Sequence, residues 1–140
     1  MCIVVDANAC HKLKSDHEDG SRVLSWLLKG RGRLVVSNSL LREIPVQSFG
    51  SLLVTLEQAG RLFRADDALC DTQAEQLRNS GKLKSNDAHI VSLVLNSPCD
   101  VVFTHDQPLH TDLKNREIVP GGCSIYQLAS HQHLLGECRC

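Results

Sequence analysis

Four carboxylates carry the chemistry that this sequence suggests: Asp6, Glu43, Asp87 and Asp106. Clustered carboxylates raise one another's pKa and destabilise an empty site, and a divalent cation removes that penalty. Oxygen ligands without Cys or His favour Mg²⁺ or Mn²⁺ over zinc. The reaction that such a site supports is phosphodiester hydrolysis, in which bound ions activate water and stabilise the leaving oxygen.

Each of these acids also has an ordinary structural interpretation. Asp87 could serve only as the N-cap of a helix, and Glu43 could be a solvated helix residue. Asp6 and Asp106 could cap loops that follow two strands. None of the three aspartates has a Lys or Arg directly beside it in the sequence to neutralise its charge. Spacing alone therefore leaves both interpretations open for each residue.

Apolar periodicity divides the chain into alternating strands and helices. This alternation predicts a three-layer α/β/α sandwich with a mostly parallel sheet, which binds ligands at the carboxyl ends of its strands. The four acids are expected at that edge. We expect strands at residues 2–5, 34–36, 61–65, 100–103 and 117–119, and helices at 19–29, 48–58, 66–79, 108–115 and 125–135, with a short helix ending at 44 and a deeply packed one after Asp87.

Length and composition limit the classes of protein to consider. The chain has 140 residues, which predicts a single domain over 1–140, and 42% of them are apolar but only 4% aromatic. The 15 basic and 16 acidic residues nearly cancel, which excludes a polyanion-coating protein. No apolar run approaches the roughly 20 residues of a membrane span, and no signal peptide is visible. We therefore expect a cytoplasmic protein.

Seven cysteines raise the question of disulfides or metal. Their odd number and the absence of a secretion signal favour reduced thiols, with Cys2, Cys70 and Cys99 as small core residues. Near the C-terminus, four side chains could hold zinc, although the spacing within each pair is tighter than in common zinc sites. These four are His131, His133, Cys138 and Cys140. A frayed tail without metal is the alternative.

Four segments resemble the motifs of PIN-domain ribonucleases, in matching order and spacing from residue 3 to about 119. A stand-alone unit of this size is similar to the VapC-type toxins of toxin–antitoxin pairs, and residues 120–140 would then be a C-terminal extension. The resemblance implies a parallel five-stranded sheet between helices and Mg²⁺- or Mn²⁺-dependent endonucleolytic cleavage of RNA. The segments are Ile3-Val4-Val5-Asp6-Ala7-Asn8, Ser37-Asn38-Ser39-Leu40-Leu41-Arg42-Glu43-Ile44, Asn86-Asp87-Ala88-His89-Ile90 and Val101-Val102-Phe103-Thr104-His105-Asp106.

The resemblance also assigns roles to individual residues. Asn8 and Thr104 match polar positions that orient the carboxylates, and Ser37 either does the same or caps a helix. Many members carry a further acid two residues after the fourth one, and Pro108, which cannot bind metal, stands there in this chain. Asp112 is a candidate replacement. A site with one ion, or with a weak second ion, is therefore expected. The catalytic and metal-binding acids by this resemblance are Asp6, Glu43, Asp87 and Asp106.

Candidate contacts with RNA come from cations near these acids in the sequence, namely Arg42, Lys82 and Lys84. Aromatic residues are few, so readout of bases by stacking is not evident. The resemblance implies a homodimer and an antitoxin peptide over the active groove. The apolar helix at 48–58 could serve such an interface or lie inside the fold.

Two other functions remain open from the sequence. A non-catalytic PIN-like module that binds RNA or protein is suggested by Pro108, and a DNA or flap nuclease could use a similar site. Setting aside the four candidate ligands leaves 12 acidic against 15 basic residues. The rest of the chain is therefore mildly cationic and could hold RNA.

Overall fold

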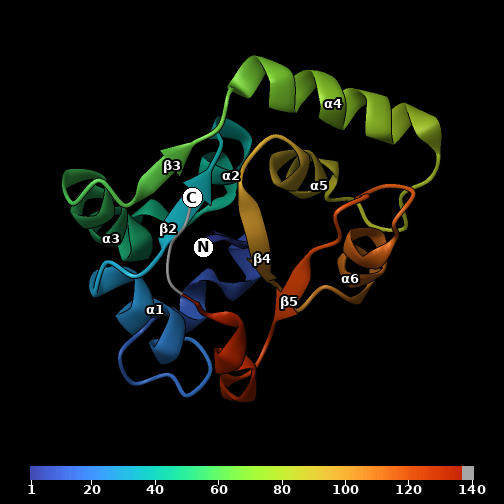
Figure 1. Ribbon diagram of the computed structural model, residues 1–140. Helices are drawn as coiled ribbons and strands as arrows, with labels where there is room; N and C mark the ends of the chain where they lie inside the picture. The colour runs from blue at the N-terminus through green and yellow to red at the C-terminus, as the bar shows by residue number, and fades with distance from the viewer. Residues whose placement is uncertain (137–140) are drawn as a thin grey trace.

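A computed structural model describes residues 1–136 and contains one five-stranded sheet flanked by helices (Figure 1). All neighbouring strands run parallel, in the order β3-β2-β1-β4-β5. The predicted α/β class with a parallel sheet is therefore confirmed. The strands are β1 (Cys2–Val5), β2 (Arg33–Val36), β3 (Leu62–Arg64), β4 (Cys99–Phe103) and β5 (Ser124–Tyr126).

Helices cover both faces of this sheet. Figure 1 shows α4, α5 and α6 on one side of the sheet and α1 and α3 on the other. Helix α5 is buried from Ala88 to Val94 because it lies between β4 and α4, which explains its almost uniformly apolar sequence. The helices are α1 (Ser21–Leu28), α2 (Asn38–Glu43), α3 (Val46–Gln58), α4 (Asp67–Ser80), α5 (Ala88–Leu95) and α6 (Gln107–Lys114), with 3-10 turns η1 (Ala7–Lys12) and η2 (Ala129–Leu134).

The register of the two central strands places the first and last acidic motifs together. All four residues of β1 are buried, as a strand covered on both faces requires. Val5 pairs with Phe103, so β1 and β4 end at the same level. The backbone N–H of Asp6 continues this pairing by donating to the carbonyl of Phe103 at 3.0 Å. The segments after both strands therefore start from one edge of the sheet.

The last strand lies elsewhere than predicted. Residues 117–119 form a turn, in which the N–H groups of Ile118 and Val119 donate to the carbonyl of Asn115 at 3.0 and 2.8 Å. The apolar side chains of this turn are buried, but its N–H groups are no longer available for a sheet.

The fifth strand is instead Ser124–Tyr126, and the expected helix at 125–135 is wrong over its first half. The buried Tyr126 pairs with Phe103, and η2 follows the strand. Residues 120–136 are therefore part of the sheet and its covering, not an appendage to it.

The cysteine interpretation holds in part. Cys10, Cys70, Cys99 and Cys123 are free thiols, and Cys70 is buried as expected. Cys2 is also buried but is disulfide-bonded, so the expectation of reduced thiols is wrong for this residue.

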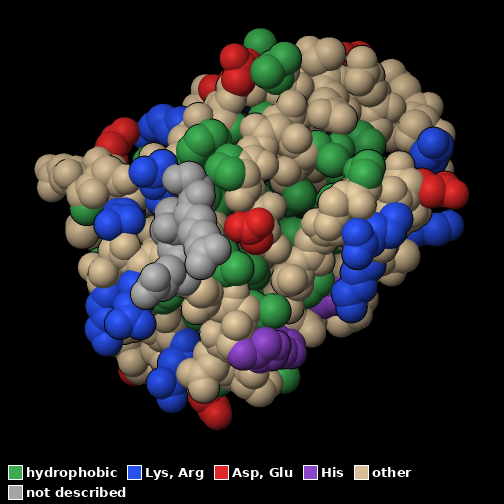
Figure 2. All heavy atoms as spheres, in the orientation of Figure 1, with side chains coloured by type: hydrophobic (Ala, Val, Ile, Leu, Met, Phe, Trp, Pro, Cys, Tyr) green, Lys and Arg blue, Asp and Glu red, His purple; other side chains and the backbone are tan. Residues whose placement is uncertain are grey.

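The proposed zinc-binding tail falls only partly within the described residues. Figure 2 shows histidine side chains at the surface in two separate places, and the ring centroids of His131 and His133, both in η2, lie 6.5 Å apart. The Nδ1 of His131 accepts hydrogen bonds from the N–H groups of Gln127 and Leu128, at 3.0 and 3.3 Å, so this ring caps the turn. Cys138 and Cys140 lie outside the described residues.

Helix α3 is not an inner helix. It packs against β3, the edge strand, with Leu56 buried and Leu52 and Leu53 partly buried. Val54 is 53% exposed. Apolar surface is thus left on the outside of this helix. Within residues 1–136, no helix has the length and apolar character needed to cross a bilayer.

Candidate functional site

Asp6 is the most deeply placed acid of the site. It directly follows β1, and only 4% of its surface is exposed. The hydroxyl of Thr104 donates to its Oδ2 at 2.8 Å and accepts from the N–H of Asp106 at 3.2 Å. Burial raises the pKa of Asp6, while the hydrogen bonds from Thr104 and the Ala7 backbone partly offset that effect. Thr104 therefore orients Asp6 and ties it to the fourth motif.

Asp87 and Asp106 form a carboxyl pair. Asp87 precedes α5 and Asp106 precedes α6, yet neither side chain caps its helix. They are hydrogen-bonded to each other instead. Burial, this hydrogen bond and the charges of Asp6, Asp106 and Glu43 raise the pKa of Asp87 to about 7. The interpretation of Asp87 as a simple N-cap is therefore wrong, because its side chain faces the other acids.

Glu43 completes the group from the end of α2. Its Oε2 lies 3.0 Å from Nε2 of His89, the second residue of α5, and its side chain is 47% exposed. His89 is buried and close enough to Asp6 to lower the pKa of that carboxyl. No role for His89 follows from the sequence. Its position two residues after Asp87 was the only signal, and its pairing with Glu43 depends on how α2 and α5 pack.

The other supporting residues act on the backbone rather than on the carboxylates. The hydroxyl of Ser37 accepts from the N–H of Leu40 at 3.3 Å and so caps α2, the helix that carries Glu43. Oδ1 of Asn8 accepts from the N–H of His105 at 3.4 Å. Ser37 thus takes the helix-cap role, and Asn8 holds the loop that leads to Asp106.

The structure does not bring Asp112 to the acids. This residue of α6 is 1% exposed, and its Oδ1 accepts from the N–H of Lys84 at 2.7 Å. Its Oδ2 accepts from the N–H and the hydroxyl of Ser85 at 2.9 and 2.6 Å. Both oxygens are therefore engaged in holding the loop before α5, and Pro108 in the first turn of α6 has no acidic substitute.

The candidate RNA-binding cations occupy exposed positions on segments that carry or precede the acids. Arg42 is adjacent to Glu43 on α2, and Lys82 and Lys84 lie on the loop between α4 and α5. Among residues 1–136, the ion pairs are Lys12–Asp19, Arg64–Glu57 and His89–Glu43. None of these pairs includes a candidate cation or any of the three aspartates of the site.

The donor chemistry of the cluster fits a hard divalent cation. Four carboxylates come from segments at one edge of the sheet, and burial, with smaller contributions from Asp106, Asp6 and Glu43, raises the pKa of Asp87. Yet no group of three or more His, Cys, Asp or Glu side chains among the described residues is already arranged to hold a metal ion. In this arrangement the Oε2 of Glu43 is engaged by the buried His89.

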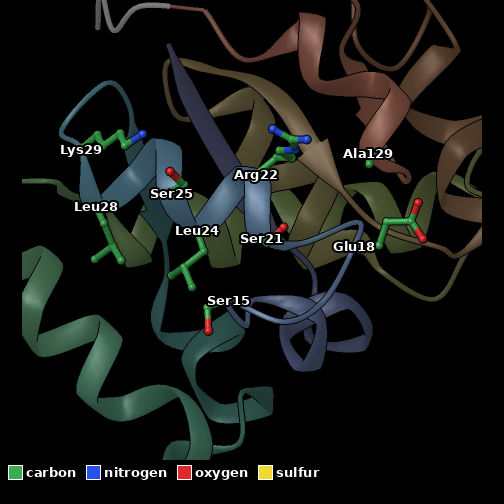
Figure 3. A pocket seen from close by; sticks show the side chains of 9 residues that line it. All are labelled: Ser15, Glu18, Ser21, Arg22, Leu24, Ser25, Leu28, Lys29 and Ala129. Atoms are coloured by element: carbon green, nitrogen blue, oxygen red, sulfur yellow. The ribbon is translucent and has the colours of Figure 1, made fainter.

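A hollow on another part of the molecule has no comparable cluster of carboxylates. It measures about 670 Å³ and lies against α1, where Figure 3 shows Leu24 and Leu28 pointing to one side of the helix and Arg22 to another. Glu18 is its only carboxylate among the lining residues. The acids Asp6, Glu43, Asp87 and Asp106 do not border it, so the candidate site remains at the carboxyl ends of the strands.

Searches against protein-family models, curated proteins and solved structures found no match to this chain. The resemblance to PIN-domain ribonucleases therefore depends on the four motifs and on the site that they form.

Proposed function

We propose that this protein is a Mg²⁺- or Mn²⁺-dependent endoribonuclease of the PIN-domain type. The observation that carries the proposal is the convergence of four acids from separate motifs, with the pKa of Asp87 raised to about 7 by burial and by its acidic neighbours. Such a cluster destabilises a protein unless it binds a cation, and perturbed carboxyls of this kind gather at functional sites.

Asp6, Asp87, Asp106 and Glu43 are the residues that would hold the ion. A bound divalent ion supplies Lewis-acid activation of water and stabilisation of the leaving oxygen. The chain's own groups prepare the site. Thr104 fixes the rotamer of Asp6, and the Asp87–Asp106 pair retains a proton that cation binding must displace. Arg42, Lys82 and Lys84 are placed to contact RNA phosphates.

A cleavage assay tests this function. Purified protein is incubated with RNA and Mn²⁺, and Asp6→Asn is compared with Asp16→Asn, which removes an exposed carboxylate that has no part in the cluster. We expect Asp6→Asn to lose activity by at least 100-fold and Asp16→Asn to cleave at the wild-type rate. Unaltered cleavage by Asp6→Asn would contradict the assignment. Single-stranded DNA of the same sequence distinguishes an RNase from a DNA or flap nuclease.

A non-catalytic binding module is the second candidate. Pro108 and the engagement of Asp112 with the loop leave the cluster with four acids, and Glu43 is turned toward His89. Calorimetric titration with millimolar Mn²⁺ separates the two functions. Absence of heat together with intact RNA binding would favour the module.

The biological setting belongs to the same proposal. By its resemblance to VapC-type toxins, the protein would act in the cytoplasm as the toxin of a toxin–antitoxin pair, as a homodimer covered by an antitoxin peptide. The exposed apolar side of α3 around Val54 is available for such an interface. Sedimentation of wild type and Val54→Asp would reveal whether that surface holds a dimer together.

A further inference from the structure

Two hollows are lined by residues that neighbour the acids in the sequence, together with residues of α4 outside the four motifs. One of about 550 Å³ lies between α2 and the second half of α4 and is bordered by Arg42. The other, of about 310 Å³, lies between the end of α4 and the loop into α5 and is bordered by Ala88. Arg78, in the last turn of α4, lines both hollows. Arg42 is next to Glu43 in the chain and Ala88 is next to Asp87, so each hollow borders a segment that carries one of the acids, and Arg78 is common to both.

The Arg78 side chain is available for a ligand. It is exposed, and it forms none of the ion pairs found among the described residues. Asp71 and Glu75 border the first hollow and would repel a phosphate there. No acid borders the second hollow, where Ser85 and Asn86 supply further polar groups. The end of α4 that faces the loop is therefore the part suited to an anion.

The loop beside Arg78 is held in place before any ligand arrives. Gly81 ends α4 with φ of +69°, a conformation that side-chain-bearing residues rarely adopt. Asp112 then binds the backbone of Lys84 and Ser85, which fixes the loop to α6. Lys82 and Lys84 are exposed on this anchored segment, which leads to Asp87. A rigid loop loses little conformational entropy when it binds a ligand.

We infer that Arg78, with the loop at 81–86, binds the phosphate backbone of an RNA strand and guides it to the carboxylates. The choice of RNA rests on the proposed function. The scarcity of aromatic side chains favours contacts with the backbone over stacking on bases, so binding should depend strongly on salt and little on sequence. Arg78 is a binding residue in this assignment and takes no part in the cleavage step.

The test measures RNA binding without metal, so that binding and cleavage are separated. The anisotropy of a fluorescein-labelled single-stranded RNA is recorded in EDTA over a series of salt concentrations for wild type, Arg78→Ala and Arg78→Lys. The matched control is Arg31→Ala, which removes the same charge from an exposed position. Arg31 lies just before the amino-terminal end of β2, whereas the acids follow the carboxyl ends of the strands.

We expect Arg78→Ala to weaken binding about tenfold and to lower the slope of log Kd against log salt by about 0.7, the value for one lost phosphate contact on a single strand. Arg78→Lys should keep the slope, and Arg31→Ala should stay within about twofold of wild type. Equal Kd and slope for Arg78→Ala and Arg31→Ala would overturn the inference. Failure of the wild type to bind RNA at low salt would overturn it too, and would indicate that the hollows at Arg78 take a protein ligand.

The outcomes also separate this inference from the proposed function. If wild type cleaves RNA with Mn²⁺ but Arg78→Ala binds RNA as wild type does, the endoribonuclease stands and the role of Arg78 is wrong. If wild type never cleaves but Arg78→Ala loses binding, the catalytic proposal is wrong and the groove remains an RNA-binding site.

Discussion

At the scale of single residues, the protonation of Asp87 is the most telling property of the site. Its pKa of about 7 lies above the ordinary value of 3.8, mainly because burial disfavours the charged form. The folded protein therefore holds this proton more tightly than the unfolded chain does. The stabilisation is complete below about pH 4 and is lost as the pH rises through about 7.

Asp87→Asn should remove this dependence on pH. In EDTA, the free energy of unfolding of wild type should fall between about pH 5 and pH 8 by more than that of Asp87→Asn, because the amide cannot ionise. Urea denaturation at both pH values measures the difference. Asp16→Asn should follow wild type, and an identical fall for Asp87→Asn would mean that Asp87 is not buried among charges.

His89 offers a second test at this scale, because its contact with Glu43 should affect metal affinity through that carboxylate alone. His89→Ala should weaken Mn²⁺ binding by about tenfold, the lower range for residues that orient a ligand. In a Glu43→Ala background the same substitution should change the affinity little.

Calorimetry on the two single variants and the double variant gives the coupling between them. His89→Gln, which retains a donor, should recover part of the affinity. Additive losses would mean that His89 only supports the fold.

At the scale of elements, the segment between α4 and α5 depends on α6. Asp112 is buried and accepts two backbone N–H groups and the hydroxyl of Ser85, so it joins the loop before α5 to the helix that follows β4. The placement of Asp87 and of the lysines beside it follows from this one carboxylate. A residue first considered as a metal ligand thus positions the site by organising its loop.

Asp112→Ala should reduce the free energy of unfolding by about 2–4 kcal/mol, because it leaves two backbone donors without their acceptor in a buried place. Ser85→Ala removes only the hydroxyl contact and should reduce it by about 1 kcal/mol. Chemical denaturation at neutral pH measures both. A reduction below that of Ser85→Ala would contradict the role of Asp112 as the anchor of the loop.

At the scale of the whole molecule, the acidic cluster makes stability depend on cations. A divalent ion bound only to the folded state adds about 2.7 kcal/mol at a concentration 100 times its Kd. For a chain of this size, Mn²⁺ should therefore raise Tm by roughly 5–10 °C. Asp6→Asn should lose most of this rise, and Asp16→Asn should retain it. Equal rises for all three proteins would place the ion elsewhere.

The sequence alone was sufficient to predict the α/β class and four of the five strands, because buried parallel strands appear as short apolar runs ended by polar residues. It also placed Asp6 and Asp106 at one sheet edge, since Asp6 directly follows one such run and Asp106 comes three residues after the end of another. The prediction of a strand at 117–119 failed because Ile118 and Val119 are apolar and buried in a turn, and apolarity reports burial rather than backbone pairing.

Only the tertiary structure decided how the acids are used. Whether Asp87 caps α5 or faces Asp106 depends on the direction of one side chain, which local sequence does not specify. Residues from different elements come together in the hydrogen bonds of Asp112 to the loop and in the contact between Glu43 and His89. The same is true of the two hollows that Arg78 lines. Such contacts arise from the packing of helices around the sheet, so they become visible only when the whole fold is assembled.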